Sequence, residues 1–319
     1  MSTSVFAAVG PAIERTKQTL FRPIELGKWF VIGFGCWLAR LLDGAGGTYG
    51  RSGWKATDSE AAAATPDLPS WLHWGALSVS VIIGLVIVAL VVLVVLAWVS
   101  SRGKFVFLDN VALNRGAIVA PWKQFAAQGW SLFWWRLGFG LAALLCIAVL
   151  VAAGVALGAT SWLVDPPDGL AILGVFVAVM LAMGLALVLA YIALCLDSFV
   201  VPIMALEGST ASEAWGRFLP LFRREPMTFL LYGLMVLLIS VGLVGVVLLV
   251  GFGTCCLGFF LLAIPYLGTV ALLPVYVFLR AFSLELLAQV EPRLNAFDPV
   301  SWLPHAEPPA PVAPESFSV

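Results

Sequence analysis

The chain has 319 residues, of which 61% are hydrophobic and only 11% are charged, and its formal net charge is −1. Soluble domains carry about 25% charged residues, so this composition excludes an ordinary water-soluble protein, and the near-zero charge argues against a nucleic-acid partner. Glu225 and Arg280 enclose 54 residues without a charge. Since a helix crosses the bilayer core with about 20 apolar residues, we expect an all-α integral membrane protein.

Uncharged apolar runs predict six transmembrane helices, at about 24–42, 73–100, 134–158, 169–197, 227–250 and 257–284. The first run is the shortest, and Lys28 and Arg40 at its ends would have to reach the two interfaces by snorkelling. The glycine-rich stretch 251–258 (GFGTCCLG) predicts a tight hairpin between the last two spans. Residues 1–290 are therefore expected to form a single membrane domain, with an extracytoplasmic loop at 43–72 and a proline-rich disordered tail at 291–319.

The cations lie mainly on one side of these predicted spans. Fourteen of the lysines and arginines lie before the first span, between the second and third, between the fourth and fifth, after the sixth, or near the span ends that face these segments. Only Arg40, Arg51 and Lys55 fall on the other side. The positive-inside rule then predicts a multi-pass protein of a bacterial inner (cytoplasmic) membrane with both termini in the cytoplasm.

A segment that mixes cations with aromatic residues precedes each odd-numbered span, at about 5–20, 116–132 and 210–222. The middle one includes the start of PWKQFAAQGWSLFWWRL (residues 121–137), and the third carries Trp215 and Phe218 on one face. A helix in the headgroup layer has lysine and arginine on its polar face and aromatic rings on the other, so we predict three amphipathic interfacial helices. The spacing of Thr210 and Glu213 is that of a capping box and predicts the start of the third.

The even-numbered spans end alike. Trp98, Tyr191 and Tyr276 occupy matching positions, 93 and 85 residues apart. Together with the three amphipathic segments, this pattern predicts three pseudo-repeats, each an interfacial helix, a span, an outer turn and a second span. We expect the spans to form a compact bundle that the interfacial helices surround.

Five ionisable residues at the cytoplasmic ends of the even-numbered spans form a candidate intramembrane charge cluster: Arg102, Asp109, Asp197, Arg280 and Glu285. Ionisable groups near the membrane core usually face the protein interior and find a partner. If the repeats surround a pseudo-threefold axis, Asp197 lies between Arg102 and Arg280. The alternatives are ordinary interface charges, a structural ion-pair cluster, and a ligand or ion site.

Motifs of catalytic chemistry are missing from the sequence. It holds no paired catalytic carboxylates, nucleophile elbow, phosphate-binding loop or HExxH sequence, so we predict no enzymatic activity, no catalytic residues, no cofactor and no metal site. All five cysteines lie in apolar segments, where cysteine behaves as a small hydrophobic residue.

Three linked segments carry a resemblance: FRPIELGKWF, SSRGKFVFLDN, and PIMALEG leading to WGRFLPLFRREP. They resemble those of a group of uncharacterised bacterial multi-pass membrane proteins, over most of residues 10–290. In architecture alone, the chain is loosely similar to the membrane domain of glycerophosphoryl diester phosphodiesterases. Neither likeness implies an activity or site residues. The first group has no assigned function, and the phosphodiesterase catalytic domain is not found in this sequence.

Two functions compete on this evidence. The leading hypothesis is a non-enzymatic integral membrane protein that organises the membrane, interacts with its lipids or acts as a scaffold. The alternative is a transporter or channel-like component for a small or lipidic solute, with a path near Asp197. The first is favoured because transport sites usually need polar residues at the midplane, where these spans have almost none. Membrane lipids are the expected partners, and the sequence does not indicate which proteins, if any, bind.

Overall fold

The computed structural model describes residues 4–22, 24–42, 71–163, 169–254, 258, 264–298 and 302, and all regular structure among them is helical. In chain order the elements are α1 (Val5–Leu20), α2 (Leu26–Arg40), α4 (Trp71–Ala112), α5 (Val119–Gln124), α6 (Ala126–Leu163), α7 (Gly169–Cys195), the π-helical η1 (Leu196–Val200), α8 (Val201–Glu207), α9 (Ala211–Arg224), α10 (Pro226–Gly253), α12 (Pro265–Ala271), α13 (Leu273–Val290) and the 3-10 helix η2 (Pro292–Leu294).

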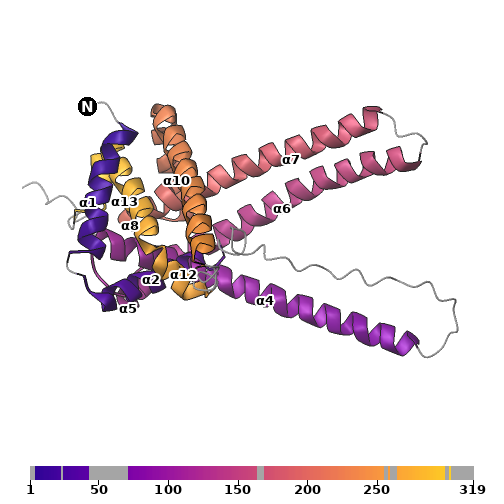
Figure 1. Ribbon diagram of the computed structural model, residues 1–319, viewed down its shortest axis with the longest axis horizontal. Helices are drawn as coiled ribbons and strands as arrows, with labels where there is room; N and C mark the ends of the chain where they lie inside the picture. Colours follow the sequence, from indigo (N-terminus) through magenta and orange to yellow (C-terminus); the bar gives the residue numbers. More distant parts are fainter. Residues whose placement is uncertain are drawn as a thin grey trace, which may run out of the picture.

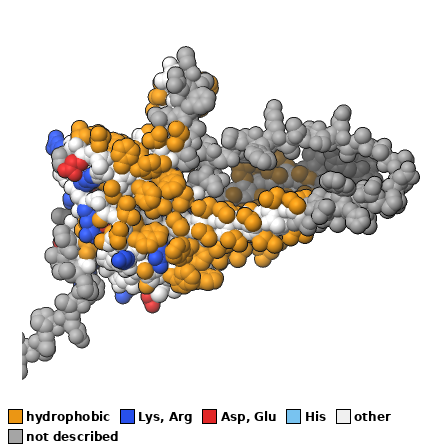
Figure 2. All heavy atoms as spheres, turned by 90° about the horizontal axis from the view of Figure 1, so that it is seen from below, with side chains coloured by type: hydrophobic (Ala, Val, Ile, Leu, Met, Phe, Trp, Pro, Cys, Tyr) orange, Lys and Arg blue, Asp and Glu red, His pale blue; other side chains and the backbone are white. Residues whose placement is uncertain are grey.

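The helices divide into a body and arms. The body consists of α1, α2, α5, α8, α9, α12, α13 and the C-terminal part of α4, whereas the arms are the apolar parts of α4, of the α6–α7 pair and of α10. Figure 1 shows α4 and the α6–α7 pair leaving the body separately, and α10 running in a third direction. In Figure 2 the charged side chains gather on the body, and the described part of the arm beside it is mainly apolar. The polar and apolar residues are thus separated along the length of the molecule.

Five helical stretches of the described chain are long and apolar enough to cross a membrane: Val81–Ala112, Ala126–Ala156, Leu173–Glu207, Pro226–Gly253 and Leu273–Val290. In the first four, the most apolar 18 residues include none that the protein buries, whereas half of those in the last are buried. These stretches support the prediction of an all-α membrane protein. They differ from the expected compact bundle, because the arms leave their apolar surface outside the protein.

The expected first span is not among these five. With 15 residues, α2 is about 22 Å long at 1.5 Å per residue, which is less than the roughly 30 Å of a bilayer core. It lies beside residues 100–112 of α4 and Asn114 just after that helix, beyond the predicted end of that span at 100. Lys28 Nζ donates a hydrogen bond to Asn114 Oδ1 (2.6 Å), and Ser100 Oγ donates one to Ala39 O (2.8 Å). The six predicted spans are therefore not confirmed.

Other boundaries also differ from the prediction. The helix predicted at 73–100 continues to Ala112, because the polar residues after Ser100 are buried within the body. The last predicted span, 257–284, is interrupted at Leu272 between α12 and α13, and α13 continues to Val290. Most of the predicted loop 43–72 lies outside the described residues, as do residues 255–257 of the predicted hairpin and 259–263 of the last span.

The predicted disordered tail begins too early at 291. Leu294 and Ala296 are buried in the core of the body. Trp302 packs edge-on against Phe125 and donates a hydrogen bond from Nε1 to the carbonyl of Ala296 (2.8 Å). The folded unit therefore extends to residue 298 and includes Trp302, because apolar residues beyond α13 find partners on other elements.

Helices form over two of the three segments that were predicted to be interfacial, since α1 covers 5–20 and α9 covers 211–224. The segment 116–132 is instead divided at Phe125 between the short α5 and the start of α6. Part of the apolar face of α9 packs on the protein, because Phe218 is fully buried and stacks on Phe199 of η1 (5.5 Å between ring centroids). Burial in the core explains the amphipathic pattern of α9.

The capping box at the start of α9 is confirmed. The Thr210 side chain accepts a hydrogen bond from Glu213 N, and Glu213 Oε2 accepts one from Thr210 N (2.9 Å). The hydrogen bond from the Thr210 backbone N–H and, to a lesser extent, the interaction with the Thr210 side chain hold the pKa of Glu213 below its usual value. The carboxylate therefore stays ionised, and the cap intact, until the pH falls through that lowered pKa.

Replacing Thr210 with alanine should therefore destabilise the protein by about 1 kcal/mol, the usual cost of a lost N-cap. The measurement is thermal unfolding of the full chain in detergent. Ser212→Ala is the control, because Ser212 is exposed two residues further along the chain and its hydroxyl contacts only the Thr210 hydroxyl (3.3 Å), not a backbone amide. An equal loss in both variants would contradict a role for the cap.

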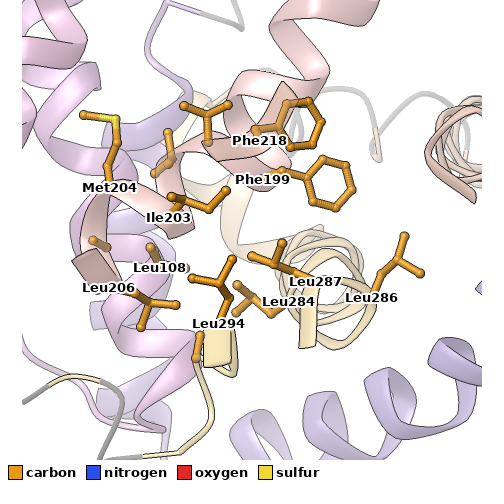
Figure 3. Packing of buried hydrophobic residues seen from close by; sticks show 14 of the residues in the cluster. Leu108, Phe199, Ile203, Met204, Leu206, Phe218, Leu284, Leu286, Leu287 and Leu294 are labelled. Atoms are coloured by element: carbon orange, nitrogen blue, oxygen red, sulfur yellow. The ribbon is translucent and has the colours of Figure 1, made fainter. Parts of the chain in front are cut away.

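The core of the body lies where η1, α8, α9 and α13 meet (Figure 3). Phe199 contacts the rings of Phe218 and Phe229, the latter edge-on at 4.9 Å. Figure 3 shows Leu284 and Leu287 of α13 facing the same space as Ile203 of α8. This packing holds η1 and α13 in a fixed relation, and the candidate site lies between them.

Candidate functional site

A π-helical segment interrupts the long helix that runs from α7 through η1 to α8. In η1 the amide of Val201 donates its hydrogen bond to Leu196 O, one residue further back than in an α-helix. Such single-turn π segments are often found at functional sites. Asp197 lies in this segment, at the point where the helix passes from the exposed arm into the buried body.

The backbone carbonyl of Asp197 needs a donor from outside its helix. Val201 N–H, its ordinary α-helical donor, bonds to Leu196 O, and the next residue along, Pro202, has no N–H. A buried carbonyl without a donor is costly. Arg280 of α13 meets this need, because its Nη1 donates a hydrogen bond to Asp197 O at 2.6 Å.

A cavity of about 100 Å³ lies beside η1, and residues of α2, α4, α10 and α13 complete its lining. We call it the charged cavity, because Arg40, Lys104, Asp197 and Arg280 all line it. Hydroxyl groups of Ser198, Tyr232, Tyr276 and Ser283 also line it. The arrangement brings three cations and one carboxylate together at the foot of the arms, that is, where the arms join the body.

The ion-pair partner of the Asp197 carboxylate is Lys104. Lys104 Nζ contacts Asp197 Oδ2, and the side chains are 3% and 34% exposed, respectively. Of the two arginines expected beside Asp197, Arg102 lies elsewhere: its guanidinium lies over the rings of Trp98 (4.7 Å) and Trp122 (5.4 Å). Residues two apart on a helix point to different faces, so Arg102 and Lys104 cannot both face η1.

Asp109 and Glu285 lie elsewhere and have their own partners. Asp109 is fully buried and accepts two hydrogen bonds from Arg115, at 2.6 and 2.9 Å, which closes the turn after α4. Glu285 accepts a hydrogen bond from Arg15 of α1 (3.3 Å). Of the five predicted residues, only Asp197 and Arg280 come together at the cavity. The sequence analysis missed Lys104, because it lies two residues from Arg102 and no local signal in SSRGKFVFLDN separates the two cations.

The model of a family of unknown function, DUF7544, matches residues 3–273. The chain belongs to this family. No curated protein and no solved structure matches it. The predicted membership of an uncharacterised family is thereby confirmed over most of the chain, whereas the looser likeness to glycerophosphoryl diester phosphodiesterases has no support.

The charged cavity of this DUF7544 chain has the electrostatics of an anion site. Its lining carries a formal charge of +2, from three cations and one carboxylate. Arg280 hydrogen-bonds a carbonyl, which is neutral, and Arg40 lies over the ring of Tyr276 at 4.2 Å. Within the described residues, no group of three or more His, Cys, Asp or Glu side chains could hold a metal ion.

Proposed function

We propose that this protein is a non-enzymatic integral membrane protein whose arms contact lipid directly and whose body organises lipids or a partner complex at one membrane surface. The observation that carries the proposal is that the apolar stretches of four long helices have no buried residue. Soluble monomers rarely expose apolar patches larger than a few hundred Å². Lipid acyl chains satisfy such surfaces, and helices satisfy their own backbone groups in lipid.

Both termini of the protein lie in the cytoplasm of a bacterial inner membrane in this proposal. The distribution of cations in the sequence supports this orientation. The packing of α1 on α13 also supports it: Arg15 pairs with Glu285 (3.3 Å) and lies over the ring of Phe297 (4.4 Å). These contacts hold the two ends of the described chain close together, as the proposed orientation requires.

The three-unit arrangement proposed from the sequence has α1, α5 and α9 at the membrane surface, with the short α2 beside the foot of α4. Exposed apolar side chains, Phe6 and Ile13 on α1 and Leu219 on α9, support surface contact. Trp130 and Trp134 are exposed near the start of α6, as in the aromatic belts at membrane interfaces. The interface would then pass through the foot of the arms.

The number of lipid molecules immobilised at the protein surface, the boundary lipid, tests the proposed arrangement of the arms. We expect the reconstituted protein to immobilise more spin-labelled lipid per chain than a compact bundle of the same helices would, because separate arms expose more apolar surface. Electron spin resonance in vesicles gives this number. A value equal to that of a compact bundle would contradict direct lipid contact along each arm.

The orientation is tested by labelling engineered thiols in a cysteine-free background. A membrane-impermeant reagent added to intact cells should label a cysteine at Ser59 and not one at Ser212, which is exposed on the body. Permeabilising the cells should make Ser212→Cys reactive, which controls for accessibility. The reverse pattern would overturn the proposed orientation.

A transporter or channel-like component for a small or lipidic solute is the second candidate. It is favoured by the charged cavity and by the π-helical segment that holds Asp197 beside it. A flux assay in the same vesicles separates the two functions. Solute movement that Asp197→Asn abolishes would favour the transporter, and its absence for a panel of anions and lipids would favour the first proposal.

A further inference from the structure

We propose that the charged cavity binds a phosphate group that retains a proton, supplied either by a phosphate monoester lipid such as phosphatidic acid or by free inorganic phosphate. The lipid form of this proposal rests on the proposed function, because it requires the arms to lie in a bilayer. The free-phosphate form does not. Four features of the cavity lead to this ligand: its charge, its size, an unsatisfied carboxylate oxygen and its position along the arms.

The charge of the lining selects an anion. Lys104 is paired with Asp197, whereas Arg280 donates to a neutral carbonyl and keeps further N–H donors on its guanidinium. Arginine is well suited to phosphate, because its planar fork donates two parallel hydrogen bonds to phosphate oxygens. A cation would meet three like charges in this cavity and only one carboxylate.

The size of the cavity selects a small group. At about 100 Å³ it offers room for a few water molecules, each of which takes about 30 Å³ in the liquid. A phosphate group is of this size. Ser198 and Ser283, which also line the cavity, add hydroxyl groups within the same small volume.

An unsatisfied oxygen selects a protonated anion. Asp197 Oδ1 is buried and has no hydrogen-bond partner among the described residues, although Oδ2 is bound to Lys104. A buried acceptor without a donor is costly. A phosphate monoester that retains one proton presents an O–H donor, whereas sulfate and phosphodiesters present none on the anionic group. Phosphate monoesters therefore fit this carboxylate best.

The position of the cavity corresponds to headgroup depth when the arms lie in lipid. On α4, exposed apolar residues end near Val95, and burial begins at Ser100, one turn before Lys104. On α10, Tyr232 is buried and lines the cavity, whereas Leu234 is already exposed. The cavity thus lies where these arms join the body, close to the level of phospholipid phosphates.

Ligand-induced thermal stabilisation of the full chain in detergent tests the proposal. Phosphatidic acid, phosphatidylglycerol and phosphatidylcholine are compared in mixed micelles, and inorganic phosphate is compared with sulfate at equal ionic strength. We expect phosphatidic acid, phosphate or both to raise the unfolding temperature, and sulfate and the two phosphodiester lipids to have much smaller effects. Arg40→Gln should weaken the apparent affinity about tenfold, the effect of losing a charge-assisted hydrogen bond.

Arg102→Gln is the matched control. It removes one cation that also lies over an aromatic ring, but Arg102 faces Trp98 and does not line the cavity, so binding should be unchanged. Arg280→Lys serves as a second variant if Arg40→Gln does not fold, and it should weaken binding by removing the planar fork. Unchanged affinity in the cavity variants, or equal effects of sulfate and phosphate, would overturn the proposal.

The experiments distinguish a lipid source of the phosphate from a soluble one, and they test the cavity proposal separately from the proposed function. Stabilisation by phosphatidic acid without an effect of inorganic phosphate supports the lipid source, and competition by inorganic phosphate supports the soluble one. If all lipids stabilise wild type and variants equally, the cavity proposal fails while lipid contact along the arms stands. If the boundary-lipid measurement fails but phosphate binds selectively, the proposed function fails and the cavity proposal stands in its soluble form.

Discussion

Replacing Gly103 with valine should destabilise the body by about 3 kcal/mol or more, the upper part of the range for overpacking. A Cβ at this position would lie 2.7 Å from both Ala39 N and the carbonyl carbon of Leu38. These are backbone atoms of α2, so no change of rotamer relieves the clash, and α2 would have to move away from α4. Small residues permit such close approach of helices in membrane proteins.

Gly84→Val is the control for this prediction. Gly84 lies in the same helix, and an added Cβ would meet nothing within 4 Å. The intrinsic cost of valine in a helix is therefore common to both variants, and the difference between them isolates the contact with α2. Thermal unfolding of the full chain in detergent, followed by circular dichroism, measures that difference. Equal unfolding temperatures would show that α2 does not pack on α4 at Gly103.

Asp197→Asn should cost roughly 2–4 kcal/mol, because it leaves the buried Lys104 ammonium without its carboxylate. The loss of one partner from a fully buried pair costs about 3–5 kcal/mol, and we lower that figure because Asp197 is 34% exposed. Lys104→Met should cost less, since the Asp197 carboxylate that remains is partly solvated. The two single variants are thus expected to be unequal, with Asp197→Asn the more damaging.

A double-mutant cycle identifies the partner. Asp197→Asn combined with Lys104→Met should cost less than the sum of the single changes, because each removes the same ion pair. Asp197→Asn combined with Arg102→Gln should be additive, because Arg102 contacts Trp98 and Trp122 instead. Equilibrium unfolding in detergent provides the four free energies for each cycle. Coupling to Arg102 without coupling to Lys104 would contradict the arrangement of α4 and η1.

Local interactions explain where the sequence-based predictions succeed. The bounds of α1 and the start of α9 follow from patterns within a few residues, and the capping box at Thr210 involves only its own helix end. Long uncharged runs likewise predict apolar helices of the observed kind, since length and hydropathy are properties of the segment itself. The Asp197–Lys104 pair joins residues 93 positions apart, and no local pattern distinguishes Lys104 from Arg102 as the partner.

The sequence by itself determined that this chain is helical, that its long segments suit a membrane, and that charged residues follow the apolar ones near Arg102, Asp197 and Arg280. Only the tertiary structure decided which of those charges meet. The rotation of α4 about its axis turns Lys104 toward η1, and Pro202 together with the π turn leaves a carbonyl for Arg280. It also placed α2 beside the foot of α4, because Gly103 allows a backbone contact that hydropathy does not encode.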